Sequence, residues 1–124
     1  MAKQHILIAE DDRLIGNAYR DKLTQAGYRV TIAKNGEETL AALRELKPDL
    51  LLLDILMPKV DGFGVLEGKQ QDDTIKDIPV IIISNFSQET YQDQAKALGI
   101  TEYIVKANFD IQQLPAKVAE YLGK

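Results

Sequence analysis

Two short apolar runs, each ending at a polar residue, place the strongest limit on the fold of this chain. Four consecutive leucines, Leu50–Leu53, lead directly into Asp54, and the run Pro79–Ile83 leads into Ser84. A short strand that is apolar on both faces is typical of a parallel sheet covered by helices on both sides. The two runs therefore predict buried strands with a polar group at the end of each.

Three further short runs complete a set of five predicted strands: His5–Ala9, Arg29–Ala33 and Glu102–Val105. The segments between the strands carry apolar residues at helical spacing, which is weakest around Val65 and Leu66. The alternation of strands and helices predicts an α/β fold, a doubly wound five-stranded parallel sheet with helices on both faces. In such a sheet, ligands bind beyond the carboxyl ends of the strands.

Glycine and proline mark several expected helix ends. Gly27 and Gly99 are predicted to be left-handed caps after two helices, and Pro48 ends a third. Pro115 would break a helix that began at Asp110, so we expect a turn over 110–114 and a last helix that starts near Pro115.

Composition excludes several classes of function. The 124 residues fit one domain, and a net charge of −4 gives no field that attracts nucleic acid. There is no cysteine and only one histidine, His5, which excludes a Cys- or His-rich metal site and suits the reducing cytoplasm. No apolar stretch approaches the ~20 residues of a membrane span. We expect a cytoplasmic domain without direct nucleic-acid or membrane binding.

Polar residues follow four of the predicted strands, at the edge where a ligand would bind: Glu10, Asp11, Asp12, Asp54, Ser84 and Lys106. Converging carboxylates repel one another unless a cation lies among them, and hard oxygen ligands suit Mg²⁺. A carboxylate beside such a metal can attack a phosphoryl group and form an aspartyl phosphate. Asp54 is the candidate nucleophile, and an ammonium and a hydroxyl from Lys106 and Ser84 would bind phosphoryl oxygens.

The chain resembles the response regulator receiver domain of two-component signalling over essentially all of its length. The resemblance depends on the motifs ILIAEDD, LLLLDILMPKVDG and YIVKA, and on the apolar strand that ends in Ser84. It implies the strand order 2-1-3-4-5 known from chemotaxis receivers. It also implies one receiver domain over 1–124, with no output domain after it in this chain.

The resemblance assigns a role to each matching residue. Asp54 matches the phosphoacceptor, and Glu10 and Asp11 match the acidic pair that holds Mg²⁺ together with Asp54 and the backbone carbonyl of Leu56. A shift of the motif by one residue would instead pair Asp11 with Asp12, which is otherwise expected to cap the first helix.

The remaining roles concern phosphate binding and signalling. Lys106 matches the phosphate-binding lysine, Ser84 the switch hydroxyl, and Tyr103 the aromatic residue that changes rotamer on activation. Two positions depart from the family pattern, because Ala107 replaces the usual proline and Asn85 replaces a small residue. The first departure puts in doubt a cis bond after the lysine.

The implied function is a switch that accepts a phosphoryl group from a sensor histidine kinase or a phosphotransfer protein. It would signal to an effector protein through the face of the fourth helix, fifth strand and last helix. It would not be an enzyme beyond assisting its own phosphorylation and slow dephosphorylation. Leu56 and Phe86 border the path of the hydrolytic water by the same resemblance, and neither can orient a water. If Phe86 turns inward, both residues are expected to slow hydrolysis of the aspartyl phosphate. If Phe86 instead packs beneath the fourth helix, Leu56 alone is expected to do so.

The main alternative is a degenerate receiver that acts as a phosphorylation-independent interaction module. A haloacid-dehalogenase-like phosphatase would need an aspartate where Leu56 lies, and a flavodoxin-like carrier would need a phosphate-binding loop where Glu10 and Asp11 lie. Neither of these enzyme and cofactor-binding classes fits the motifs.

Overall fold

A computed structural model describes residues 3–55, 57 and 61–122 of the chain. It contains one parallel sheet with the strand order β2-β1-β3-β4-β5, which confirms the predicted fold class and order. The strands are β1 His5–Ala9, β2 Arg29–Ala33, β3 Leu50–Leu53, β4 Val80–Ser84 and β5 Glu102–Val105. The fourth strand begins one residue later than the apolar run, because Pro79 has no N–H to donate to the sheet. The strand also includes Ser84.

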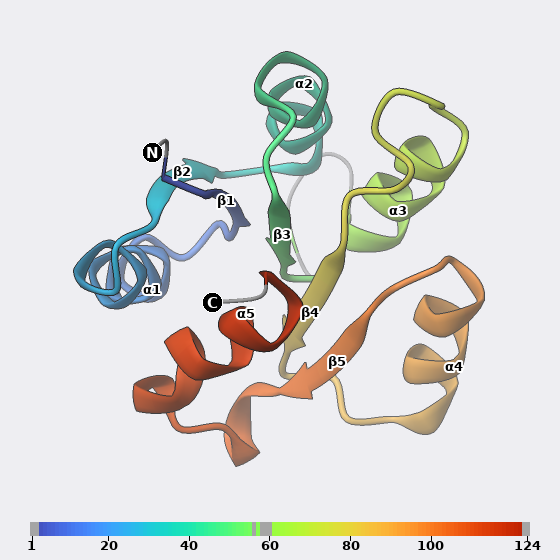
Figure 1. The fold of residues 1–124 in the computed structure, drawn as a ribbon. Coiled ribbons are helices and arrows are strands. Elements are labelled where there is room, and N and C mark those ends of the chain that lie inside the picture. Colours follow the sequence, from blue (N-terminus) through green and yellow to red (C-terminus); the bar gives the residue numbers. More distant parts are fainter. Residues whose placement is uncertain (1–2, 56, 58–60, 123–124) are drawn as a thin grey trace.

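Five α-helices cover the two faces of this sheet (Figure 1). They are α1 Arg13–Gln25, α2 Gly36–Leu46, α3 Gly62–Gln70, α4 Glu89–Ala97 and α5 Leu114–Leu122. Helices α1 and α5 pack on one face, and α2, α3 and α4 pack on the other.

The leucines of β3 show how the sheet divides its core between the two faces. Leu51 and Leu53 belong to the cluster beneath α2, α3 and α4, whereas Leu50 and Leu52 belong to the cluster beneath α1 and α5. All four are essentially inaccessible to solvent. The continuous apolar run is thus explained by alternate side chains that enter two separate cores.

Local signals set several helix ends. Gly27 and Gly99 have φ angles of 100° and 85°, which confirms both as left-handed positions after a helix. Lys47 adopts φ 44° in the same role before Pro48, although it carries a side chain.

The C-terminal segment differs slightly from the prediction. A short 3-10 turn spans Ile111–Gln113, as expected for this region, and α5 begins at Leu114, one residue before Pro115. A proline in the first helical turn costs no intrahelical hydrogen bond, which explains why the helix tolerates it there. Within residues 3–55, 57 and 61–122 no peptide bond is cis, so the bond between Lys106 and Ala107 is trans. None of the helices in this part of the chain is long and apolar enough to span a membrane.

Candidate functional site

The carboxyl edge of the sheet gathers the polar residues that the sequence places after its strands. Glu10 follows β1, Asp54 follows β3, Ser84 ends β4 and Lys106 follows β5. Because β1, β3, β4 and β5 are consecutive neighbours in the sheet, their ends meet at one place. Glu10, Asp54 and Ser84 are buried, with exposed fractions of 3%, 7% and 1%. Buried polar groups need partners, and here the partners are largely one another.

Lys106 is the central cation of this site. Its Nζ lies 2.9 Å from Oε1 of Glu10 and 3.1 Å from Oδ2 of Asp54, and it donates a hydrogen bond to each carboxylate. Burial alone lowers the pKa of Lys106, but the hydrogen bond to Glu10 and the charge of Asp54 outweigh it and raise that pKa above its usual value. The lysine is therefore held in its charged form between two carboxylates.

Glu10 is more strongly perturbed. Burial, with a contribution from the charge of Asp54, raises the pKa of the Glu10 carboxyl to about 7, even though Lys106 acts in the opposite direction. Its second oxygen, Oε2, accepts a hydrogen bond of 3.2 Å from the backbone N–H of Asp12. One lysine does not compensate for this concentration of carboxylates, which leaves the site suited to a further cation.

A third carboxylate lies beside this pair. Ligand oxygens of Glu10, Asp11 and Asp54 lie within 4.8 Å of one another, and Asp11 is exposed. An all-oxygen set with one solvent-facing member suits a hard divalent cation that keeps several waters, as Mg²⁺ does. The predicted fourth ligand, the backbone carbonyl of Leu56, lies outside the described residues.

Asp12 has a different task. Its Oδ1 accepts hydrogen bonds from the backbone N–H groups of Leu14 at 3.0 Å and Ile15 at 3.2 Å, and so caps the N-terminus of α1. The acidic cluster is therefore formed by Glu10 and Asp11, and the shifted pairing of Asp11 with Asp12 is not the one that the fold produces.

Gly62 lies directly against the backbone of the candidate phosphoacceptor. A Cβ atom at this position would lie 2.6 Å from Cα of Ile55 and 2.8 Å from the carbonyl oxygen of Asp54. The N–H of Gly62 donates a 2.8 Å hydrogen bond to the carbonyl of Ile55, and Asp61 caps α3 by accepting from Gly64. The start of α3 thus packs directly against the backbone of Asp54 and Ile55. The Asp61-Gly62 pair is visible in the sequence, but the contact that requires a glycine is not.

Ser84 and Tyr103 both bond to the backbone of Phe86, in the connection between β4 and α4. Oγ of Ser84 accepts a 3.1 Å hydrogen bond from the N–H of Phe86, and the hydroxyl of Tyr103 donates a 2.7 Å hydrogen bond to its carbonyl. Tyr103 is half-buried, and burial raises the pKa of its hydroxyl. Movement of either side chain would therefore be transmitted to the same loop residue.

The ring of Phe86 packs against α4. It stacks on Tyr91 with centroids 4.8 Å apart and planes 20° apart, and Tyr91 stacks in turn on Phe63 of α3 at 6.0 Å and 18°. Of the two orientations considered from the sequence, the structure therefore shows the one in which Phe86 lies against the fourth helix. Phe63 and Tyr91 are a tertiary contact that no sequence motif indicated.

The fold and this site place the chain in the doubly wound α/β class with an acidic site at the carboxyl edge of its sheet. The family model described as "Response regulator receiver domain" matches residues 6–119, and the chain belongs to this family.

Two curated relatives illustrate the range of the family. The polar-differentiation response regulator DivK of Brucella anthropi is 32% identical over 118 residues, which cover 95% of both chains. The DNA-binding dual master transcriptional regulator RpaA of Synechocystis sp. is 36% identical over 119 residues, which cover 96% of this chain and 49% of RpaA. The chain spans about half the length of such transcriptional regulators.

Solved structures agree with the fold. The phosphorylated cyanobacterial phytochrome response regulator RcpA is 30% identical, with a TM-score of 0.87 and coverage of 98% of this chain and 95% of RcpA. A CheY-like receiver domain protein from Methanospirillum hungatei is 26% identical, with a TM-score of 0.90 and the same two coverages.

Proposed function

We propose that this receiver domain is a phosphorylation switch in the cytoplasm, and that Asp54 accepts a phosphoryl group from the histidine of a sensor kinase or a phosphotransfer protein. One observation carries the proposal: Lys106 bridges the buried carboxylates of Glu10 and Asp54 at the edge where Ser84 also ends its strand. Burying two carboxylates around one lysine costs stability. A degenerate receiver would gain nothing in return for this cost, so the cluster favours a functional site.

In the proposed reaction an oxygen of the Asp54 carboxylate attacks phosphorus, a P–O bond forms, and the bond from phosphorus to the donor breaks. Lys106 and Ser84 would donate hydrogen bonds to the transferred phosphoryl oxygens, which positions the group and neutralises its charge. Glu10 and Asp11 would hold Mg²⁺, which supplies further charge neutralisation. The domain would catalyse nothing beyond its own phosphorylation and slow loss of phosphate.

Signalling would follow from the shared attachment of Ser84 and Tyr103 to Phe86. If Ser84 turns to a phosphoryl oxygen, its Oγ leaves the N–H of Phe86, and Phe86 keeps its bond to Tyr103 but loses its bond to Ser84. Such a change would shift the population of conformations of the face formed by α4, β5 and α5. An effector protein that binds this face is the proposed receiver of the signal.

The test of the phosphoacceptor is intact mass after incubation with Mg²⁺ and acetyl phosphate. The wild-type chain should gain one phosphoryl group, and Asp54→Asn should gain none, because an amide cannot attack phosphorus. Asp93→Asn, which removes an exposed carboxylate on α4, is the matched control and should be phosphorylated like the wild type. If the wild type gains no mass, the degenerate interaction module becomes the better explanation.

The metal is tested by thermal unfolding with and without Mg²⁺. Because the acidic cluster exists only in the folded chain, a metal at 100 times its Kd should stabilise the fold by about 2.7 kcal/mol. Asp11→Ala should lose this effect, since it removes one of the three carboxylates. A wild-type melting temperature that does not respond to millimolar Mg²⁺ would refute the metal site.

A further inference from the structure

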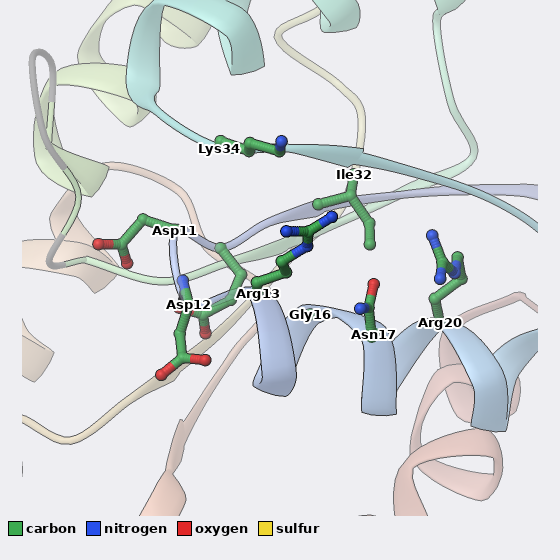
Figure 2. A pocket seen from close by; sticks show the side chains of 9 residues that line it. Asp11, Asp12, Arg13, Gly16, Asn17, Arg20, Ile32 and Lys34 are labelled. Atoms are coloured by element: carbon green, nitrogen blue, oxygen red, sulfur yellow. Dashed lines mark hydrogen bonds between the residues drawn. The ribbon is translucent and has the colours of Figure 1, made fainter.

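A pocket of about 580 Å³ lies between α1 and the end of β2, next to the acidic cluster (Figure 2). This volume is in the range of sites that hold small organic molecules. The proposed phosphoryl transfer uses only the acidic residues at one end of the pocket. The remainder is lined by residues of α1, by Ile32 and by Lys34, none of which takes part in that reaction.

Three cations surround this remainder: Arg13 and Arg20 of α1, and Lys34 directly after β2. None of them forms an ion pair with any residue in the part of the chain that the structure describes. Arg13, Asn17 and Arg20 follow the spacing of one helix face, and Figure 2 shows all three side chains rising from α1 toward the strand that carries Ile32. Glu10, Asp11 and Asp12 line the same pocket, so its positive charge is concentrated only where these three cations lie.

The acidic residues at the other end are oriented away from this group. Figure 2 shows the side chains of Asp11 and Asp12 directed away from the two arginines. Glu10 is engaged by Lys106, and Asp12 caps the helix. The pocket therefore has a cationic end whose three cations form no ion pair with the neighbouring described carboxylates.

The wall between these charges is apolar. Gly16 brings the α1 backbone close to β2, because a Cβ there would already lie 3.7 and 3.8 Å from two carbon atoms of Ile32. Ile32 lines the same pocket and is half-buried. A flat organic group could pack on this surface while anionic groups extend toward the cations.

We propose that the cationic end of this pocket binds a small organic molecule that carries two or more phosphate groups, of the chemical class of a nucleoside diphosphate. Two guanidinium groups offer the paired donors that suit phosphate oxygens, and Lys34 adds a point charge from the opposite side. The carboxamide of Asn17 provides both a donor and an acceptor for the organic part. This site is independent of phosphoryl transfer to Asp54.

Isothermal titration of metal-free protein, prepared on a chelating resin, tests the proposal. ADP should bind more tightly than pyrophosphate, and adenosine should show no measurable binding, because the cations supply most of the affinity. The double variant Arg13→Gln, Arg20→Gln should weaken ADP binding at least tenfold. Lys96→Gln, which removes an exposed cation on α4, is the control and should leave the affinity unchanged.

Amide NMR locates the site in the same samples. ADP should shift the signals of Gly16, Asn17 and Ile32 more than those of Ser84 and Lys106, which lie at the phosphoryl site. The proposal fails if ADP does not bind at millimolar concentration, if the double variant binds it as tightly as the wild type, or if the shifts centre on Lys106. Equal affinities for pyrophosphate and ADP would refute the role of the apolar wall. Phosphorylation of Asp54 is measured separately, so failure of either proposal leaves the other intact.

Discussion

The two ends of the sheet provide partners for their polar residues in different ways. At the amino end, Oδ2 of Asp49 accepts a 2.7 Å hydrogen bond from the N–H of His5, whose Nε2 lies 2.8 Å from Oγ1 of Thr31. The backbone closes this network, because the N–H of Asp49 donates to the carbonyl of His5. At the carboxyl end, Glu10 and Asp54 instead share one cation, Lys106.

The difference separates a structural arrangement from a functional one. Polar groups bonded to backbone partners are satisfied by the fold itself and need nothing further. Glu10 and Asp54 instead depend on the side chain of Lys106 for their counter-charge, and in the proposed function a metal would share this role. We therefore place the chemistry at the carboxyl end of the sheet, where the buried charges are paired with another side chain.

The largest expected effect is on Lys106, with the buried Lys69 as the comparison. Lys106→Met leaves Glu10 and Asp54 buried without their cation and should lower the free energy of unfolding by about 3 kcal/mol. Lys69→Met removes a lysine that is more deeply buried than Lys106 and that donates to the backbone carbonyl of Lys76, at 2.7 Å, rather than to a carboxylate. Burial lowers the pKa of Lys69, so its loss should cost about 1 kcal/mol or less.

Urea unfolding of both variants in metal-free buffer provides the measurement. Equal destabilisation by the two substitutions would contradict the view that the carboxyl end depends on shared charge. Lys106→Met should also slow phosphorylation by acetyl phosphate, whereas Lys69→Met should leave it unchanged.

A smaller effect is expected at Gly62. An alanine there must displace the backbone of Asp54 and Ile55, and overpacking of this kind costs about 1 to 3 kcal/mol. Gly16→Ala is the control, because its Cβ meets only ordinary contacts and an alanine favours a helix by about 0.5 to 1 kcal/mol. Thermal unfolding should show opposite shifts for the two variants, and only Gly62→Ala should slow phosphorylation. A Gly62→Ala protein as stable and reactive as the wild type would show that Asp54 does not need this support.

The smallest effect is the pH dependence of the amino end. Burial and the charge of Arg29 lower the pKa of His5, against the opposing effect of Asp49. His5 takes up a proton near pH ~6.5 in the unfolded chain and only at lower pH in the folded chain. The contribution of neutral His5 to the free energy of unfolding is therefore lost as pH falls below about 6.5. Glu10 acts in the opposite direction, because its raised pKa favours proton uptake by the folded chain.

The variant His5→Gln isolates the first contribution, since Glu10 is present in both proteins. The stability of the wild type relative to His5→Gln should decrease between about pH 7.5 and 5.5 in metal-free urea titrations. A constant difference across this range would mean that His5 takes up its proton equally in both states.

Most of the site follows from the sequence because two simple facts determine it. Apolar runs define the strands, and parallel pairing brings the residue after each strand to a common edge. Glu10, Asp54, Ser84 and Lys106 were therefore predicted to share one edge; Lys106 contacts both Glu10 and Asp54, and Ser84 ends β4 at the same edge. The choice between Glu10 and Asp12 as the partner of Asp11 needed the structure, because both follow the same strand and the cap that Asp12 forms on α1 distinguishes them.

Other features could not be predicted, because they depend on distances between segments far apart in the chain. The approach of Gly62 to Asp54 is set by how α3 packs, and the stack of Phe63, Tyr91 and Phe86 by how α3 and α4 lie together. The unpaired cations of α1 are visible in the sequence as charges, but the pocket that they line is not.

The strand order also bears on how the site is assembled as the chain is made. β3 pairs with β1, and from β4 onward each strand pairs with the one before it, so every new strand extends a single growing edge. Residues 5–54 already contain β2, β1 and β3, together with Glu10 and Asp54. Lys106 follows the last strand and arrives more than fifty residues after Asp54 has been synthesised. A nascent chain thus carries the repelling carboxylates before their counter-charge. Synthesis of β5 and Lys106 then completes both the sheet and the site.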